Sequence, residues 1–384
     1  MRHFPFRKLL VVLIIIAGIP MISYLLWLFK SEKQMEVLVM NKTVTSEDRK
    51  EHKAVFWILN HNRFVRKNGE TYDYKNDYYG FFPFTAYHGK EYEIKDISVK
   101  DIDRLSDKYD LAWIIDTYGL SFNDWYGYSA SDTFPRMLYG GLTQNDYSFI
   151  LEMLKKNKLV IIEFNFFSSP TSNLLRAEAE NLLDIYWSGW TGMYYDNLDY
   201  TLNAALPTWI VDSYRKQNSG DWPYTKSGII LVHENNDIIV LENETHLDIE
   251  TPMVITTNEN ADRYGVTTEV HYPHRFDVSY AADTSNVISY YELSVNSYGD
   301  RLLKRHNIPG RFPALTRNSE NGKIYYLAGS FSEYDIPILS SCFQGAGELD
   351  FYLNKDKIGS TGSFFWTYYY PFISTVLSEY YDSL

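Results

Sequence analysis

The sequence predicts an α/β protein with a mostly parallel sheet covered by helices on both faces, a β-richer C-terminal portion and one N-terminal transmembrane helix. Three observations support this prediction. Residues 9–29 contain no charged side chain. Between residues 35 and 185, strands that are apolar throughout alternate with helical segments, which is typical of a parallel sheet buried on both faces. After residue 225, short strand-like segments follow one another with turn signals between them.

The N-terminal run predicts a membrane anchor. It is 21 residues long, and about 20 residues cross the hydrocarbon core of a bilayer. Residues 1–8 carry Arg2, Arg7 and Lys8 and no acidic residue, so the positive-inside rule keeps this tail in the cytoplasm. A cleaved signal peptide is the alternative, but such peptides end in a small-x-small site and this run ends in Tyr-Leu-Leu-Trp-Leu-Phe. We therefore expect a single-pass protein of the cell membrane with the bulk of the chain extracytoplasmic.

Composition narrows the class of protein and its partners. Cys342 is the only cysteine among 384 residues, so no disulfide can form within the chain. An exported domain of this size without disulfides is typical of the bacterial cell envelope. The net charge of −13 argues against nucleic acid as a partner, because binding it needs a basic patch. The 34 tyrosines and 9 tryptophans suit stacking on sugar rings, and they suit a large core or a protein interface equally well.

The expected elements divide one extracytoplasmic domain, residues 35–384, into two portions. A parallel core, residues 35–200, has strands at 36–40, 110–116 and 159–163 and helices at 46–60, 99–108, 144–157 and 170–183. Ser46 and Thr143 are the expected N-caps of two of these helices. The β-richer portion, residues 205–384, has a hairpin over 228–241, strands at 253–257, 287–293 and 323–327, and helices at 206–217, 300–306 and 372–381. No internal repeat or low-complexity linker separates the two portions.

Polar residues follow three of the predicted parallel strands. In open parallel sheets, ligands bind at the carboxyl ends of the strands, so Asn41, Asp116 and Glu163 are expected to face one crevice, with the loops 77–82 and 125–136 at its rim. The candidate binding residues are Asn41, Lys42, Asp77, Tyr79, Tyr118, Arg136, Asn165, Trp190 and Tyr194. Two further residues, Asp116 and Glu163, are candidate catalytic carboxylates.

A carboxylate pair is what glycoside hydrolysis requires, one as acid and the other as nucleophile or base. Asp116 and Glu163 could instead cap the next helix or pair with Lys42 or Arg136. Trp190 and Tyr194, in the segment WSGWTGMYYDNLD, could form a sugar platform or pack beneath a loop. The segment His271-Tyr-Pro-His274 is interpreted as a turn. We find no HExxH, Walker, GxGxxG or GxSxG motif, and we expect neither a metal nor a cofactor.

The order of elements carries one resemblance. The segments VLVMNKT (37–43), DLAWIIDTYG (110–119) and GGLTQNDYSFILEMLKKNKLVIIEFN (140–165), together with the helix beyond them, resemble the class I glutamine amidotransferase-like, flavodoxin-like fold. More narrowly, the chain resembles uncharacterised signal-anchored bacterial envelope proteins of that shape. True amidotransferases carry a cysteine in the turn after a central strand. The equivalent segment here, VIIEFNFFSSP (160–170), has none, so the resemblance implies the fold and argues against glutaminase activity.

Three functions are compatible with these observations. The first is an accessory envelope protein, not an enzyme, that binds a polysaccharide or a membrane partner handling one. The second is a glycan hydrolase that uses Asp116 and Glu163. The third is a non-catalytic scaffold in a surface complex, with the tyrosines serving its contacts.

Overall fold

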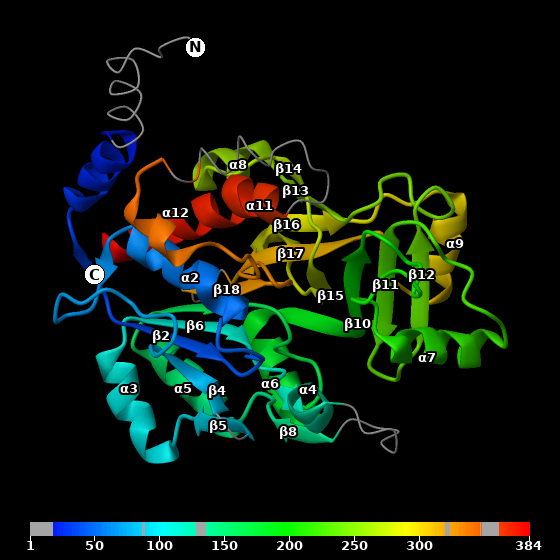
Figure 1. The fold of residues 1–384 in the computed structure, drawn as a ribbon, viewed down its shortest axis with the longest axis horizontal. Coiled ribbons are helices and arrows are strands. Elements are labelled where there is room, and N and C mark those ends of the chain that lie inside the picture. Colours follow the sequence, from blue (N-terminus) through cyan, green and yellow to red (C-terminus); the bar gives the residue numbers. More distant parts are fainter. Residues whose placement is uncertain (1–17, 87–88, 128–135, 319–322, 346, 348–360) are drawn as a thin grey trace, which may run out of the picture.

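A mixed ten-stranded sheet runs through the molecule (Figure 1). The structure is a computed structural model that describes residues 18–86, 89–127, 136–318, 323–345, 347 and 361–384. In order across the sheet, the strands are β14 (Glu269–His271), β13 (Met253–Thr256), β16 (Val287–Glu292), β17 (Arg311–Arg317), β18 (Ile324–Leu327), β9 (Leu159–Ile162), β6 (Leu111–Asp116), β2 (Val37–Asn41), β4 (Tyr78–Ala86) and β5 (Gly89–Lys95).

The prediction of a mostly parallel sheet is wrong. Within this sheet, only the pairings from β18 through β9, β6 and β2 to β4 are parallel, and its other described pairings are antiparallel. Strand β18 joins the two regions, because it pairs with β17 on one side and β9 on the other. Parallel neighbours need a long crossover, whereas β17 and β18 follow each other closely along the chain and form an antiparallel pair. The C-terminal strands therefore extend the parallel sheet with antiparallel ones.

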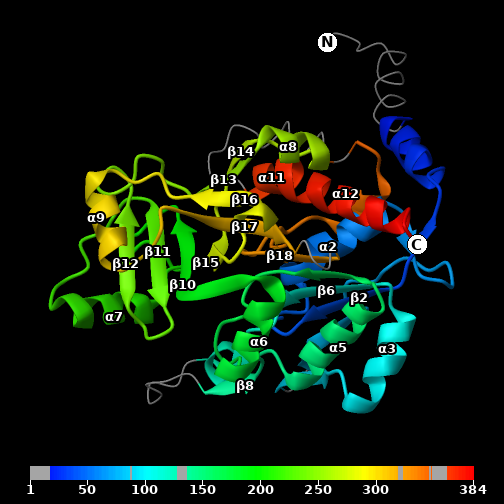
Figure 2. The ribbon, with the colours of Figure 1, turned by 180° about the vertical axis from the view of Figure 1, so that it is seen from behind.

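Helices cover both faces of the parallel region (Figures 1 and 2). Helices α3 (Ile102–Lys108), α5 (Gln144–Lys155) and α6 (Asn173–Leu183) lie on one face, and α2 (Lys50–His61) and α12 (Tyr370–Tyr381) on the other. Thr143 caps α5 in a reciprocal capping box with Asp146, as predicted. Ser46 is not a cap, because α2 begins only at Lys50.

A second, four-stranded sheet lies at the end of the molecule away from the C-terminus (Figure 1). In order, it contains β12 (Ile238–Glu242), β11 (Gly228–His233), β10 (Ile185–Tyr195) and β15 (Arg275–Ala281), with α7 (Thr208–Asn218) beside it. The hairpin predicted over 228–241 is confirmed, since β11 and β12 pair antiparallel. Strands β10 and β15 were not predicted. Strand β15 contributes residues to the candidate site.

The remaining described elements are short. They are β1 (Lys33–Gln34), β3 (Phe64–Val65), β7 (Leu120–Ser121), β8 (Met137–Tyr139), α4 (Phe122–Tyr126), α8 (Asn258–Tyr264), α9 (Ser297–Arg305), α11 (Thr361–Phe364), a π-helical turn (Phe365–Tyr369) and three 3₁₀ turns (Val99–Asp101, Thr284–Asn286 and Ile338–Cys342).

The prediction of a transmembrane helix over residues 9–29 is also wrong for the residues that the structure describes. Within the described ranges, no helix has both the length and the apolarity needed to cross a membrane. The described part of the run is helical over 18–28 and is held against the folded domain. There the Trp27 indole N–H donates to Asn60 O at 3.2 Å, and the Arg63 guanidinium lies 4.6 Å from the Trp27 ring centre. The predicted cytoplasmic tail, 1–8, and residues 9–17 of the run lie outside the described residues.

Candidate functional site

The carboxyl ends of β2, β6 and β9 converge on the side chain of Asp116. Its Oδ1 accepts hydrogen bonds from Thr43 Oγ1 at 2.8 Å and from the Tyr118 backbone N–H at 2.7 Å. Its Oδ2 accepts one from Asn165 Nδ2 at 3.1 Å. Thr43 and Asn165 come from the loops after β2 and β9, so residues from all three loops lie at this carboxylate, whereas the side chains of Asn41 and Glu163, expected to face the same crevice, are buried.

Asn165 has a backbone conformation that residues other than glycine adopt rarely. It follows β9 with φ at 61°, in the left-handed region, which asparagine tolerates better than most residues. Its carbonyl oxygen accepts a hydrogen bond from Thr117 Oγ1 at 3.0 Å. Unusual backbone conformations that the surroundings hold in place occur often at functional sites, and this turn presents its amide directly to Asp116.

A strand from the second half of the chain completes the arrangement. Asp277 of β15 is 1% exposed and accepts hydrogen bonds from Tyr326 OH at 2.9 Å and from Thr191 Oγ1 at 3.2 Å. Arg275, on the same strand, is 48% exposed and close enough for its charge to stabilise ionised Asp116. We call the following set the Asp116 cluster: Thr43, Asp116, Tyr118, Asn165, Arg275 and Asp277.

Both carboxyl groups of the cluster hold their protons more tightly than free aspartate. Asp116 is partly exposed as a residue, but its carboxyl group is enclosed by its donors, and burial raises its pKa to about 6. Burial raises the pKa of Asp277 to about 7, and the charge of Asp116 adds to that rise. An acid with a pKa near neutrality can exchange a proton with a ligand, and of these two acids Asp116 is the one that is partly exposed.

Sequence reasoning missed Asp277 and Arg275 because it did not predict β15. A usable signal was present in the alternation of polar and apolar residues in the segment RFDVSYA (275–281), directly after the turn at Pro273. Such alternation predicts a strand with Arg275 and Asp277 on one face.

Glu163, the other candidate catalytic residue, points into the core. It is 1% exposed. Its carboxylate accepts hydrogen bonds from Trp113 Nε1 at 2.9 Å, Tyr369 OH at 2.6 Å and the Ser332 N–H at 3.1 Å. Burial raises its pKa to about 7. The catalytic pairing of Asp116 with Glu163 stays a prediction, but the carboxyl group whose pKa the charge of Asp116 raises is that of Asp277.

Two candidate binding residues, Asn41 and Lys42, are buried and hold the loop after β2 in place. Asn41 is buried, contacts His52 Nδ1 at 3.2 Å through its amide nitrogen and accepts from the Thr43 N–H at 2.9 Å. Lys42 is buried and donates to Asp146 Oδ2 at 2.6 Å and to the carbonyl oxygen of Gly141 at 3.0 Å. Both side chains are engaged within the protein and help to place Thr43.

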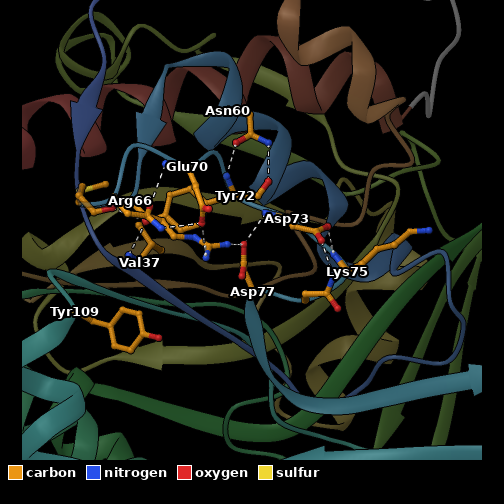
Figure 3. Close-up of polar contacts among 12 residues, drawn as sticks. Val37, Asn60, Arg66, Glu70, Tyr72, Asp73, Lys75, Asp77 and Tyr109 are labelled. Carbon is orange, nitrogen blue, oxygen red and sulfur yellow. Dashed lines mark hydrogen bonds and ion pairs between the residues drawn. The ribbon is translucent and has the colours of Figure 1, made fainter.

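Each of the expected rim residues contacts a neighbouring side chain or backbone group of the protein. Asp77 forms an ion pair with Arg66 and accepts from the Asp73 N–H at 2.7 Å, which ties down the loop before β4 (Figure 3). Tyr79 is half-buried, with the Lys95 ammonium 4.3 Å from its ring centre. Arg136 is exposed, and its guanidinium lies 5.1 Å from the Phe122 ring centre. Residues 128–135 of the predicted rim lie outside the described residues.

The two aromatic candidates belong to β10 in the second sheet. Trp190 is buried with its ring centre 4.9 Å from that of His233 and 5.7 Å from that of His306. Tyr194 is half-buried, and burial raises its pKa to about 12. The packing interpretation of Trp190 fits its burial.

Comparisons with known proteins add little. No family model matches the chain, and no curated protein matches it. A similar solved structure is that of a ThuA-like protein from Parabacteroides merdae, at 12% identity over 77% of this chain and 79% of that chain, with a TM-score of 0.35. So low a similarity supports no argument about this chain. In the part of the chain that the structure describes, no group of three or more His, Cys, Asp or Glu side chains is arranged to hold a metal ion.

Proposed function

We propose that the chain is an extracytoplasmic accessory protein that binds a cell-envelope polysaccharide at the Asp116 cluster. The observation that carries this proposal is the hydrogen-bonded pair of Asp116 and Asn165 at the carboxyl ends of β6 and β9. A carboxylate and an amide held side by side offer acceptors and a donor to neighbouring sugar hydroxyl groups. The predicted resemblance to amidotransferase-like envelope proteins without the catalytic cysteine is compatible with a binding role.

The surroundings of the pair also suit a neutral or weakly charged sugar. Tyr118 is partly exposed and lies two residues from Asp116, where its ring could contact a sugar face. Arg275 is half-exposed and offers further donors, although its Nη1 lies 3.6 Å from Glu333 Oε2. The site thus combines acceptors, donors and an aromatic ring within one small group of loops.

Calorimetric titration of the full chain tests the proposal. The probes are defined oligosaccharides of N-acetylated hexosamines, free hexosamines and uronic acids. Asp116→Ala should weaken binding about tenfold or more, because hydrogen bonds to a charged group contribute about 1.5–3 kcal/mol. Asp212→Asn on α7, 61% exposed, is the control and should bind as the wild type does. No binding to any probe, or equal binding by the Asp116→Ala variant, would contradict the proposal.

A second candidate function is glycan hydrolysis. The raised pKa of Asp116, at about 6, favours it, because an acid near neutrality can donate a proton to a leaving group. Release of reducing ends from the same oligosaccharides is the assay. Asp116→Asn should abolish any release, and Glu163→Gln should abolish it only if the predicted pair of Asp116 and Glu163 does the chemistry.

A further inference from the structure

We propose that His52 is a positioning residue of the Asp116 cluster: it holds the Asn41 side chain, which fixes Thr43, so that the Thr43 hydroxyl group points at the Asp116 carboxylate. The role of His52 rests on the proposed function, since the exposed part of the proposed site depends on this buried residue. It also gives α2 a part in the site, although no member of the cluster belongs to that helix.

A chain of hydrogen bonds connects α2 with Asp116. His52 of α2 contacts the Tyr74 carbonyl oxygen through Nε2 at 2.9 Å and the Asn41 amide nitrogen through Nδ1 at 3.2 Å. The Asn41 side-chain oxygen accepts from the Thr43 N–H at 2.9 Å, and Thr43 Oγ1 donates to Asp116 Oδ1 at 2.8 Å. The contacts therefore lead from the loop before β4, through α2 and the loop after β2, to the end of β6.

Each proton between Thr43 and Tyr74 has one possible position. The Thr43 N–H can only donate, so the side-chain oxygen of Asn41 faces it, and the Asn41 amide nitrogen donates to His52 Nδ1. At the other end, the Tyr74 carbonyl oxygen can only accept, so His52 Nε2 carries the proton. Both ends require the same neutral tautomer. Burial lowers the pKa of His52 to about 4, and the charge of Arg49 adds to that fall, so this tautomer persists above about pH 5.

The last link is the Thr43 hydroxyl group. Thr43 Oγ1 accepts from the Gly119 N–H at 2.8 Å, while its own proton goes to Asp116 Oδ1. Its direction depends on the backbone of Thr43, which Asn41 holds through the N–H. Without His52, the buried amide nitrogen of Asn41 would lose its acceptor, and an unpaired buried polar group costs enough free energy to favour a turn of the side chain.

His52 is firmly placed and out of reach of a ligand. It is fully buried, and its ring centre lies 4.5 Å from that of Tyr78 on β4. The loop that supplies its carbonyl acceptor is bonded twice to Asn60 of the same helix: Asn60 Nδ2 donates to the Tyr72 carbonyl oxygen at 2.9 Å, and Asn60 Oδ1 accepts from the Tyr72 N–H at 3.0 Å (Figure 3). The effect of His52 on the site therefore passes through Asn41.

Titration of the Asp116 carboxyl group, followed by nuclear magnetic resonance of the full chain labelled with ¹³C-aspartate, tests the proposal without a ligand. In the wild type the pKa of Asp116 is about 6, and the hydrogen bond from Thr43 lowers it against the effect of burial. Thr43→Val removes that bond and should raise the pKa by about one pH unit. His52→Ala should raise it by a similar or smaller amount, and should add little in the Thr43→Val background, because both changes act on one hydrogen bond. Neutral His52 takes no charge away from the site, where Arg275 and Asp277 are the charged neighbours of Asp116.

The tautomer of His52 supplies a second measurement, through the imidazole resonances of ¹⁵N-histidine-labelled protein. His52 should carry its proton on Nε2 at neutral pH, and Asn41→Asp, which replaces the amide donor with an acceptor, should protonate Nδ1 as well. His61 of the same helix is the matched control, since it is 3% exposed and its Nδ1 donates to the Ser341 carbonyl oxygen at 3.0 Å. Its Nδ1 should carry a proton in both proteins, and His61→Ala should leave the pKa of Asp116 unchanged.

Glycan affinity separates the role of His52 from the proposed function. His52→Ala should weaken binding about threefold or more, and His52→Gln, which offers a donor and an acceptor, should recover part of that loss. An unchanged pKa of Asp116 in His52→Ala, or an equal rise with and without Thr43→Val, would overturn the inference. If the wild type binds no probe, the proposed function fails while the titration still decides the role of His52. If His52→Ala does not fold, Asn41→Asp takes its place, and a His52 imidazole that stays singly protonated there overturns the inference.

Discussion

Replacing Glu163 with glutamine should remove a pH-dependent loss of stability. Glu163 directly follows β9 and is buried, and its carboxylate accepts hydrogen bonds from Trp113, Tyr369 and Ser332. Burial nevertheless dominates and raises its pKa from 4.5 to about 7. The folded protein therefore binds a proton at pH values where the unfolded chain has released it, so this residue makes stability fall as the pH rises from about 4.5 to about 7.

The size of the effect follows from the change in pKa. At about 1.4 kcal/mol for each pKa unit, the rise to about 7 corresponds to about 3 kcal/mol of unfolding free energy lost between acid and pH 8. Glutamine has the shape of the protonated acid and does not ionise. Its amide group faces the Ser332 N–H, which costs about 1–3 kcal/mol at every pH, so the informative quantity is the slope with pH and not the absolute stability.

Urea unfolding between pH 5 and pH 8 measures this slope. Asp116 and Asp277 contribute their own pH dependence, but they do so in both proteins, and the difference between Glu163→Gln and the wild type isolates Glu163. That difference should grow in favour of glutamine by about 2–3 kcal/mol across the range, because part of the loss occurs below pH 5. Asp48→Asn, at an exposed position, should follow the wild type. Parallel curves for Glu163→Gln and the wild type would refute the reasoning.

Three further experiments, each by chemical denaturation, test residues that support the site. Lys42→Met leaves the buried Asp146 carboxylate without its 2.6 Å partner and should cost about 3–5 kcal/mol, and addition of Asp146→Asn should recover part of it. Gly80→Ala should cost more than about 1 kcal/mol, because φ is +128° and the new Cβ would lie 1.9 Å from Asn41 O, at the β2–β4 pairing. Asn165→Gly should be more stable than Asn165→Ala by about 1–2 kcal/mol, since only glycine adopts φ 61° without strain. Equal stability of these last two variants would contradict the assigned backbone role.

The parallel core was predictable because its residues are governed by local rules. The segment Leu111–Asp116 is apolar until its last residue, so it predicts both a buried strand and a polar strand end. Thr143 followed by Asp146 predicts a helix start, and the structure has one there. Convergence of Asp116 and Asn165 followed from parallel neighbours alone, because the carboxyl ends of such strands share one edge.

The antiparallel half and its contribution to the site were not predictable in the same way. Whether β18 pairs with β9 depends on contacts between residues about 160 positions apart, for example Ile324 with Val160, which no local pattern encodes. The direction of Glu163 is a similar case. Its neighbour at the strand end, Asn165, faces Asp116, whereas Glu163 meets Tyr369 from the C-terminal π-helical turn. A strand-end carboxylate can point to either face, and the surrounding packing decides which.

The sequence by itself determined the α/β class, the buried strands of the parallel core and two members of the Asp116 cluster that later proved to touch, Asp116 and Asn165. These features depend on side-chain periodicity and strand ends, which are local. Only the tertiary structure decided that the sheet is mixed, that the described helix at 18–28 lies against the domain, and that Asp277 of β15 is buried against Tyr326 and Thr191. The physical reason is that desolvation and long-range hydrogen bonding select among pairings and side-chain directions that the local sequence leaves equally open.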